Sequence, residues 1–375
     1  MRFTVSQEEL TQALTRAQAI ADRKSSMPIL AHVLLQAKEG YLHLCATDLT
    51  LQVTSTLKAS IEEEGQLTLP ARTLFDVVKN LPSAAVELAS VDDAQVEVRA
   101  GKSRYRLAYL KGDDYPELPQ ADEAKECTMN VESQRLLSVL SKVHISMTQD
   151  SSRPHLAGAL LEIHKDRLRM VSIDGHRLTC VESLGDTPQA LDPLLLPAKG
   201  VHELRRLLED KLIAGDDTQV RVMINRPYFF LQRGSVILGI KLIQDGFPPY
   251  AQVIPQSHQR QAVVSRQALV DALRRVRVLM QDKSRPVRFC FESASLQLTS
   301  ESPEVGDAYE EIEASYEGET LMIGLNAGYV LDALGVLEDE EITLQLSGDL
   351  DPSVIRPATQ GQEDSFVGVI MPIRV

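Results

Sequence analysis

Hydrophobic residues recur along the chain with two spacings, one helical and one typical of strands. In SQEELTQALTRAQAI, SQRLLSVLSKVHIS and SRQALVDALRRVRVLM, a serine precedes leucines four residues apart. Because this spacing lines one face of a helix and a serine hydroxyl caps a helix start, each segment predicts an amphipathic helix with an N-cap. The serines and leucines are Ser6, Leu10 and Leu14; Ser133, Leu136 and Leu140; and Ser265, Leu269 and Leu273.

A second motif follows each of these segments. It reads LTLPARTLFDVVKNL, LLLPAKGVHELRRLL and MIGLNAGYVLDALGVL, and each copy predicts a short apolar strand that leads into another amphipathic helix. Between the motifs, stretches such as HVLLQAKEGYLHLCATDLTLQVTSTL alternate apolar and polar residues, with Gly, Asp or Ser at the breaks. This pattern predicts antiparallel strands joined by turns.

The two motifs repeat at nearly constant offsets. Pro70 and Pro197 are 127 positions apart, Pro197 and Asn326 are 129 apart, and one third of the 375 residues is 125. We therefore predict three tandem domains of one α+β fold, in which helices pack on one face of antiparallel sheets. The predicted domains are 1–122, 127–252 and 260–375, with polar linkers near 120–127 and 252–261. Equivalent domains laid end to end favour head-to-tail association, which gives a ring or a filament.

Composition and cysteine usage indicate an ordinary globular protein. Hydrophobic residues make up 43% of the chain and charged residues 25%, and the start MRFTVSQEEL lacks the apolar region of a signal peptide. No window approaches the length of a membrane span, so we expect a cytoplasmic protein. Because the four cysteines lie far apart without a CxxC pair, we interpret them as reduced packing thiols, not as disulfides or a zinc site. They are Cys45, Cys127, Cys180 and Cys290.

The net charge of −14 is the wrong sign for a protein that coats nucleic acid with its whole surface. The charge is uneven, however. The predicted helices (7–21, 71–80, 133–146, 198–208, 265–280 and 326–337) carry twelve basic and six acidic residues, so they hold +6 and the rest of the chain −20. One interpretation is that Lys and Arg are good helix formers on solvated faces. The other is that the helices line one surface that contacts phosphates without reading bases.

Catalytic motifs are absent from the sequence: it contains no GxxxxGK[ST], GxGxxG, HExxH or GxSxG. The best catalytic candidate is the pair Asp174 and His176 in IDGHRL, with Arg177 beside it, which gives a hydrolase as an alternative function. The first repeat places Asp48 at the same position without a His or Arg, which favours a turn whose aspartate accepts hydrogen bonds from backbone amides. A second alternative is a repeat scaffold that binds only proteins.

Over its full length the chain resembles the DNA polymerase III β subunit family, the bacterial sliding clamps. The motifs that carry the resemblance are FTVSQEELTQAL, MPIL at 27–30, ATDL at 46–49, PAR at 70–72, IDGHRL at 173–178, PAKG at 197–200, GFPPY at 246–250 and the terminal MPIRV. The resemblance implies a head-to-tail homodimer that closes into a ring around duplex DNA, with helices inside and sheets outside. It implies no catalytic activity, no metal and no cofactor, and as partners the replicative polymerase, the clamp loader and other proteins with a clamp-binding motif.

The resemblance also implies three functional surfaces. The partner-peptide cleft comprises Leu156, Gly175, His176, Arg177, Leu178, Pro248, Val253, Asn326, Tyr329, Ser353, Val369, Ile370, Met371, Pro372, Ile373 and Arg374. The phosphate contacts comprise Lys24, Arg72, Gln149, Arg153 and Lys199. The dimer contact pairs Arg104, Tyr105, Arg106 and Leu107 with Val278, Leu279, Glu301 and Glu304 of the third domain.

Overall fold

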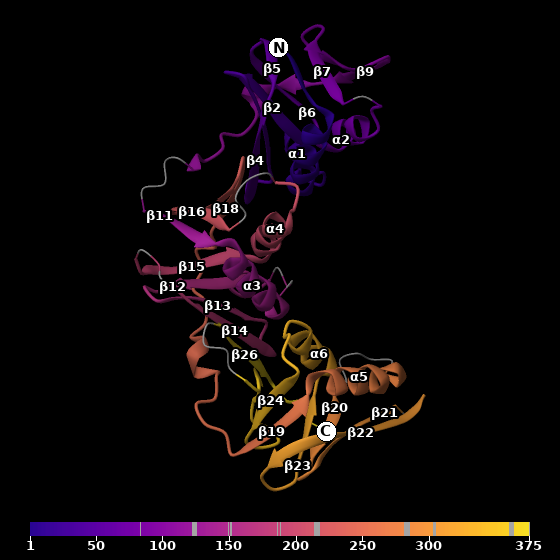
Figure 1. Cartoon of the computed structure of the whole chain (residues 1–375), viewed down its shortest axis with the longest axis vertical. Helices are drawn as coiled ribbons and strands as arrows, with labels where there is room; N and C mark the ends of the chain where they lie inside the picture. Colours follow the sequence, from indigo (N-terminus) through magenta and orange to yellow (C-terminus); the bar gives the residue numbers. More distant parts are fainter. Residues whose placement is uncertain are drawn as a thin grey trace. The chain divides into compact units, whose positions relative to one another are not determined.

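The computed structural model of the chain (Figure 1) describes residues 1–82, 84–121, 126–148, 150, 152–185, 187, 189–213, 218–280, 286–302, 305–359 and 364–374. Packing divides the chain into two units. Unit 1 comprises Met1–Gln134 and Arg206–Leu242, and unit 2 comprises Arg135–Arg205 and Ile243–Val375.

Unit 1 contains two antiparallel sheets. The five-stranded sheet has the order β5-β1-β7-β8-β9 and the nine-stranded sheet the order β10-β6-β2-β3-β4-β18-β17-β16-β11. The strands are β1 (Arg2–Ser6), β2 (His32–Lys38), β3 (Tyr41–Thr47), β4 (Leu51–Lys58), β5 (Ser60–Glu63), β6 (Gly65–Pro70), β7 (Ala85–Ser90), β8 (Gln95–Ala100), β9 (Ser103–Ala108), β10 (Leu110–Lys111), β11 (Cys127–Glu132), β16 (Gln219–Asn225), β17 (Tyr228–Arg233) and β18 (Val236–Lys241).

Helix α1 (Gln7–Ile20) packs against α2 (Ala71–Lys79) and against β3 and β4 of unit 1 (Figure 1). It begins where the sequence predicts, after Ser6, whose Oγ accepts a hydrogen bond from the Glu9 amide at 3.5 Å. Leu10 and Leu14 lie on its buried face, and burying a leucine stabilises a fold by about 2 kcal/mol. The helical spacing in the sequence therefore marks the face that packs on the sheet.

Unit 2 contains a twelve-stranded antiparallel sheet of order β15-β12-β13-β14-β26-β25-β24-β19-β22-β21-β20-β23. Its strands are β12 (Gly158–Ile163), β13 (Arg167–Ile173), β14 (Arg177–Leu184), β15 (Leu191–Pro197), β19 (Arg260–Ser265), β20 (Val287–Phe291), β21 (Ser295–Ser302), β22 (Gly306–Glu317), β23 (Leu321–Leu325), β24 (Glu341–Leu346), β25 (Ser353–Pro357) and β26 (Asp364–Ile370). Helix α5 (Arg266–Val276) packs against α6 (Ala327–Gly335) and against β22. Ser265 caps α5 as predicted, because its Oγ accepts a hydrogen bond from the Ala268 amide at 3.4 Å.

The two remaining helices, α3 (Ser133–Val143) and α4 (Ala198–Glu209), cross the division between the units. The middle repeat is shared for a physical reason. Its strand β18 pairs with β4 of the first repeat, and its strand β14 pairs with β26 of the third. Three sequence repeats therefore pack as two units, and the predicted domain boundaries stay a prediction.

The cysteines fit the interpretation as packing residues. Cys45, Cys127 and Cys180 are buried, and Cys290 is partly exposed. In the part of the chain that the structure describes, no α-helix combines the length and the hydrophobicity needed to cross a membrane.

Candidate functional site

The tightest group of predicted site residues in unit 2 starts at the turn between β13 and β14. The Asp174 Oδ1 atom accepts hydrogen bonds from the backbone amides of His176 at 2.9 Å and Arg177 at 3.0 Å. Gly175 has φ +95°, a backbone conformation that glycine adopts without strain. Asp48 holds the equivalent turn of the first repeat, where its Oδ1 accepts from the amides of Thr50 and Leu51. The prediction of a turn-capping aspartate is confirmed.

Arg177 connects this turn to helix α6. Its Nε atom is 3.0 Å from Asp174 Oδ2, and its Nη1 atom is 2.6 Å from Asp332 Oδ2. The guanidinium lies 4.3 Å from the centre of the Tyr329 ring, which the His176 ring also faces at 6.4 Å. Burial, then the nearby Asp174 charge, raises the pKa of Tyr329. The turn and α6 thus present the His176 imidazole and the Tyr329 phenol side by side, with the paired Arg177 over the phenol ring.

Beside this turn lies an apolar cluster on the sheet. Two cross-strand rows form it: Leu160, Val171, Cys180 and Val367 in one, and Ile173, Leu178 and Val369 in the other. Leu156 and Val354 complete the buried part, and Phe247, Tyr250, Val253 and Ile254 pack against it while partly exposed. We call this set the unit 2 cluster. It is a continuous apolar surface, and the segment 247–254 packs along its side.

The end of the chain borders the same cluster. Strand β26 places Ile370 opposite both Arg177 and Ser353, and the Met371 amide donates a hydrogen bond to the His176 carbonyl at 2.9 Å. The Ser353 side chain is fully buried, and its Oγ has no hydrogen-bond partner among the residues that the structure describes. Met371 is 39% exposed. The chain end therefore adds both an exposed apolar side chain and backbone groups to the site.

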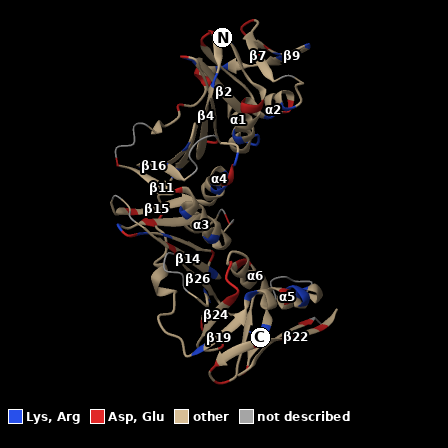
Figure 2. Cartoon of the chain, in the orientation of Figure 1, with Lys and Arg blue, Asp and Glu red and all other residues tan. Residues whose placement is uncertain are grey.

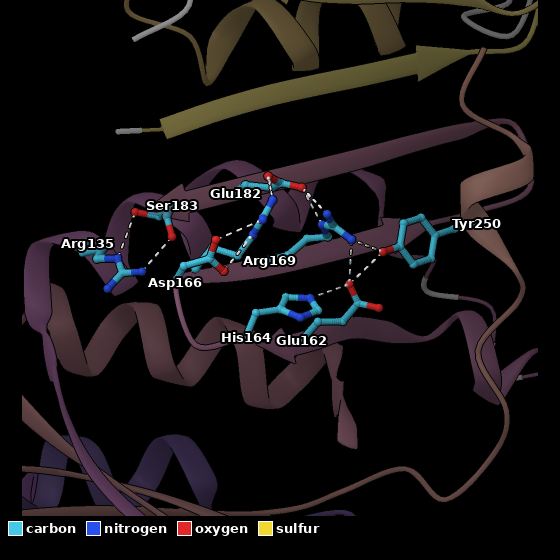
Figure 3. Close-up of polar contacts among 9 residues, drawn as sticks. Arg135, Glu162, His164, Asp166, Arg169, Glu182, Ser183 and Tyr250 are labelled. Atoms are coloured by element: carbon cyan, nitrogen blue, oxygen red, sulfur yellow. Dashed lines mark hydrogen bonds and ion pairs between the residues drawn. The ribbon is translucent and has the colours of Figure 1, made fainter. Parts of the chain in front are cut away.

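A polar network holds the segment that flanks the cluster (Figure 3). The Tyr250 hydroxyl donates to Glu162 Oε2 at 2.7 Å and accepts from Arg169 Nη1 at 3.0 Å. Arg169 also pairs with Glu162 at 3.2 Å and donates to Glu182 Oε1 at 2.6 Å. Burial and the bond to Glu162 raise the pKa of Tyr250 to about 12. Tyr250 thus ties its segment directly to β12 and β13, and through Arg169 to β14.

The structure brings together most of the predicted cleft residues. Leu156, Leu178 and Val369 belong to the unit 2 cluster, Val253 packs against it, and Pro248 lies in the flanking segment. Three residues have other positions. The Asn326 Oδ1 atom caps α6 by accepting from the amides of Gly328 at 2.8 Å and Tyr329 at 3.4 Å. Beyond Met371 and Pro372, the Ile373 amide binds the Gly324 carbonyl of β23, and Arg374 is exposed.

Several residues of this site were not among the predicted ones. Asp332 pairs with Arg177 from 155 positions away, and no local sequence signal reports that contact. Val171 and Ile173 did have a signal, because Met170, Val171 and Ile173 put apolar residues at both odd and even positions of β13, and every residue from Met170 onward is buried. The alternation of apolar and polar residues along a strand is lost where both faces of the sheet are covered. This loss marks the strands on which the cluster lies.

The predicted phosphate contacts lie at helix ends and loops. Lys24 is exposed after α1, and Arg72 on α2 is exposed and pairs with Asp76 at 3.0 Å. In unit 2, Arg153 is exposed 3.6 Å from Asp150, and Lys199 is exposed in the first turn of α4. The fifth predicted contact, Gln149, lies outside the described residues.

The separation of charge persists with the observed helix bounds. The six α-helices carry eleven basic and seven acidic residues, a surplus of +4, which leaves −18 on the rest of the chain. The surplus is smaller than the predicted +6 because Glu209 lies inside α4 and Arg277 lies beyond α5. Figure 2 shows Lys and Arg on α4 and α5.

The predicted dimer contacts occupy one exposed edge strand and one exposed turn. Strand β9 is the last of its sheet, with Arg104, Tyr105 and Arg106 exposed and Leu107 partly so. In unit 2, Val278 and Leu279 lie in the 3₁₀ turn η7 (Arg277–Leu279), and Val278 is 79% exposed. Glu301 pairs with Arg288 at 2.7 Å, and Glu304 lies outside the described residues.

Among the residues that the structure describes, no group of three or more His, Cys, Asp or Glu side chains could hold a metal ion.

Sequence models of one family match nearly the whole chain. The N-terminal, central and C-terminal domain models of the DNA polymerase III beta subunit match residues 1–119, 130–249 and 251–374. A relative named beta sliding clamp, from Pseudomonas putida, is 33% identical over 377 aligned positions that cover 100% of both chains.

Solved structures show the same likeness. The DNA polymerase III subunit beta of Pseudomonas aeruginosa has a TM-score of 0.92 at 29% identity, with 100% of both chains covered. A sliding clamp from Bartonella birtlesii, solved bound to griselimycin, has a TM-score of 0.92 at 32% identity and the same coverage. Three tandem domains with antiparallel sheets and helices are therefore shared with these proteins. The chain belongs to the DNA polymerase III β subunit family, the β sliding clamps.

Proposed function

We propose that this chain is a cytoplasmic DNA sliding clamp. Two copies close head to tail into a ring around duplex DNA and tether the replicative polymerase, the clamp loader and other partners. The family is a processivity factor and not an enzyme, so the hydrolase alternative with Asp174 and His176 is set aside. Tethering raises the concentration of the polymerase at the primer end without any chemical step in the clamp itself.

The observation that carries the proposal is the separation of charge, +4 on the helices and −18 elsewhere. Phosphate contacts from helices are independent of base sequence and are screened by salt, so they permit sliding. Lys24, Arg72, Arg153 and Lys199 supply such contacts in this proposal, together with Gln149. Because the closed ring keeps the clamp on the DNA, each phosphate contact can be weak.

The dimer contact joins the edge strand β9 of one copy to the third domain of the other. An edge strand carries unpaired backbone groups that a second chain can bind. Arg104 and Arg106 on β9, which share the buried Glu97 at 3.4 Å, would meet an acidic surface of the other copy that includes Glu301, and opposite charges favour head-to-tail pairing. Val278 supplies apolar area, since burying a valine contributes about 1.5–3 kcal/mol.

Sedimentation of a Val278→Lys variant tests the ring. The variant should be monomeric at concentrations where the parent is dimeric, because lysine places a charge where apolar contact is needed. Leu350→Lys is the matched control, since Leu350 is also exposed, at 53%, and lies outside the proposed interface. A Val278→Lys protein that dimerises as tightly as the control would refute this contact.

The partner-peptide cleft is formed by the unit 2 cluster with the His176, Arg177 and Tyr329 group at its edge. A largely apolar surface with a few fixed polar groups is the usual form of a site for short peptides. His176→Ala should weaken binding of a peptide from the polymerase while the dimer stays intact. His258→Ala, at an exposed histidine outside the cluster, is the control. Equal peptide affinity for the two variants would remove His176 from the cleft.

A further inference from the structure

Unit 1 contains a hollow that none of the proposed surfaces uses. It lies between strands β2, β3, β4 and β18 and the segment Gly112–Ala121. Its volume is about 1240 Å³. Pockets for drug-sized molecules measure about 300–1,000 Å³, so this hollow has room for a short extended chain. We call it the unit 1 groove.

The floor of the unit 1 groove repeats the layout of the unit 2 cluster. Leu34, Cys45, Thr54 and Ile237 lie opposite one another on β2, β3, β4 and β18. The corresponding strands of unit 2 carry the row Leu160, Val171, Cys180 and Val367. The same repeat therefore places an apolar row beneath a linking segment in both units.

The two rows differ in how much covers them. Phe247, Tyr250, Val253 and Ile254 pack against the unit 2 cluster. In unit 1 the Leu34 and Cys45 end is covered by Tyr115, Leu118 and Ile29. At the other end of the row, Ile237 packs against the buried cluster of Ala121, Met223 and Phe230, yet Thr54 and Ile237 remain partly exposed and line the hollow.

The groove is held in a fixed shape. The Tyr115 hydroxyl donates to the His32 carbonyl at 3.4 Å and accepts from the Thr47 amide at 3.1 Å. Further along the segment, Gln52 Nε2 donates to the Pro119 carbonyl at 2.7 Å. Because the walls are tied in place, a bound chain would not have to order them, which favours affinity.

The rim of the groove is acidic. Among the described residues that line it, Glu64, Asp113 and Glu117 face one lysine, Lys38, which pairs with the neighbouring Glu39 at 3.2 Å. This charge attracts cationic side chains and repels DNA. An extended chain alternates its side chains between two directions. Its aliphatic side chains would face the floor while its basic side chains face the rim.

We infer that the unit 1 groove is a second docking site, which takes an extended peptide segment of a partner protein in which aliphatic and basic residues alternate. It differs from the unit 2 cleft in its rim. The turn that carries His176 and Arg177 in unit 2 carries Thr50 and Leu51 here, so the groove lacks these two side chains, and the histidine that lines it, His43, comes from β3. The two sites therefore select peptides of different composition.

Two fluorescein-labelled peptides test the inference in fluorescence polarisation with the full-length chain. In one, leucine alternates with lysine, and in the other, leucine alternates with glutamate. The lysine peptide should bind more tightly. Asp113→Asn and Glu117→Gln should each weaken it about two- to fivefold, the effect of removing one exposed ion pair. Asp93→Asn, an exposed carboxylate of unit 1 outside the groove, should leave its affinity unchanged.

A substitution in the floor of the unit 1 groove tests whether the peptide binds there. Ile237→Lys places a charge in the floor, where the leucine side chains of the peptide would pack, and should weaken the lysine peptide at least about tenfold because the ammonium loses water without gaining a partner. No binding at millimolar peptide, equal affinity for the two peptides, or full binding to Ile237→Lys would each overturn the inference.

The result is independent of the proposed function. The lysine peptide should bind His176→Ala as tightly as the parent, and a polymerase peptide should bind Ile237→Lys as tightly as the parent. Loss of the polymerase peptide in Ile237→Lys would mean that the substitution disturbs the fold, and the Asp113→Asn and Glu117→Gln variants then decide the question.

Discussion

Replacing Tyr250 by phenylalanine removes one hydroxyl from the polar network beside the unit 2 cluster and leaves the ring in place. The hydroxyl is 2.7 Å from Glu162 Oε2 and 3.0 Å from Arg169 Nη1 (Figure 3). The ion pair between Arg169 and Glu162, at 3.2 Å, does not involve the hydroxyl and should survive. The substitution therefore frees the flanking segment from the sheet without breaking the charges beneath it.

The size of the effect follows from these contacts. A hydrogen bond to a charged group contributes about 1.5–3 kcal/mol. The side chains of Glu162 and Arg169 are 16% and 27% exposed, so water can replace part of what the hydroxyl supplies. We expect a net loss of about 1–2 kcal/mol, which increases the local opening of the segment roughly 5- to 30-fold.

Hydrogen exchange of the segment measures that opening directly. The Val253 amide donates to the Tyr250 carbonyl at 3.0 Å, and the Gln252 amide donates to the Pro249 carbonyl at 3.3 Å. Both amides should exchange faster in Tyr250→Phe by the factor given above, and affinity for a polymerase peptide should fall with them. Tyr41→Phe is the control, because Tyr41 is 43% exposed and lies in unit 1.

Unchanged protection of these two amides in Tyr250→Phe would refute the reasoning, since the hydroxyl would then contribute nothing to docking the segment. Faster exchange with unchanged peptide affinity would refute only the assignment of this segment to the cleft.

Three other properties follow from the same structure. Gly175→Ala should destabilise the protein by about 1–2 kcal/mol in denaturant unfolding, because φ +95° strains alanine, whereas Gly246→Ala meets nothing within 4 Å and should be neutral. Since the pKa of Tyr250 is raised to about 12, the folded state keeps a proton that an unfolded tyrosine loses near pH 10. Stability should therefore fall from pH 10 toward 12, and a tyrosinate absorbance step in that range should be missing in Tyr250→Phe. Burial raises the pKa of Cys180 to about 12, so partly exposed Cys290 should react with a thiol reagent while Cys180 reacts only on unfolding.

Local and repeated features of this fold were predictable from the sequence. The serine caps at Ser6 and Ser265 and the turn at Asp174 depend on residues at most three positions apart, so a short pattern contains the whole contact. The antiparallel sheets were predictable because all three copies of the repeat show the same alternation of apolar and polar residues.

Contacts between distant segments were not predictable. The pairing of Arg177 with Asp332 and the hydroxyl contact of Tyr250 with Glu162 join residues far apart along the chain, and both depend on how strands are ordered in the sheet. The sharing of the middle repeat between two units has the same origin, because it follows from the pairing of β18 with β4 and of β14 with β26. Asn326 differs from these residues because its contact is local. It was predicted to line the cleft, and its side-chain oxygen instead accepts a hydrogen bond from the Gly328 amide and caps α6.

Retention on circular against linear DNA tests the central claim most directly. The chain would be loaded by its clamp loader onto nicked circular duplex DNA, and the DNA would then be cut once. A closed ring should stay on the circle at a salt concentration that screens phosphate contacts and should leave within the time of sliding once the DNA is linear. A protein that binds DNA by its surface alone would dissociate equally from both forms, and that result would contradict the account.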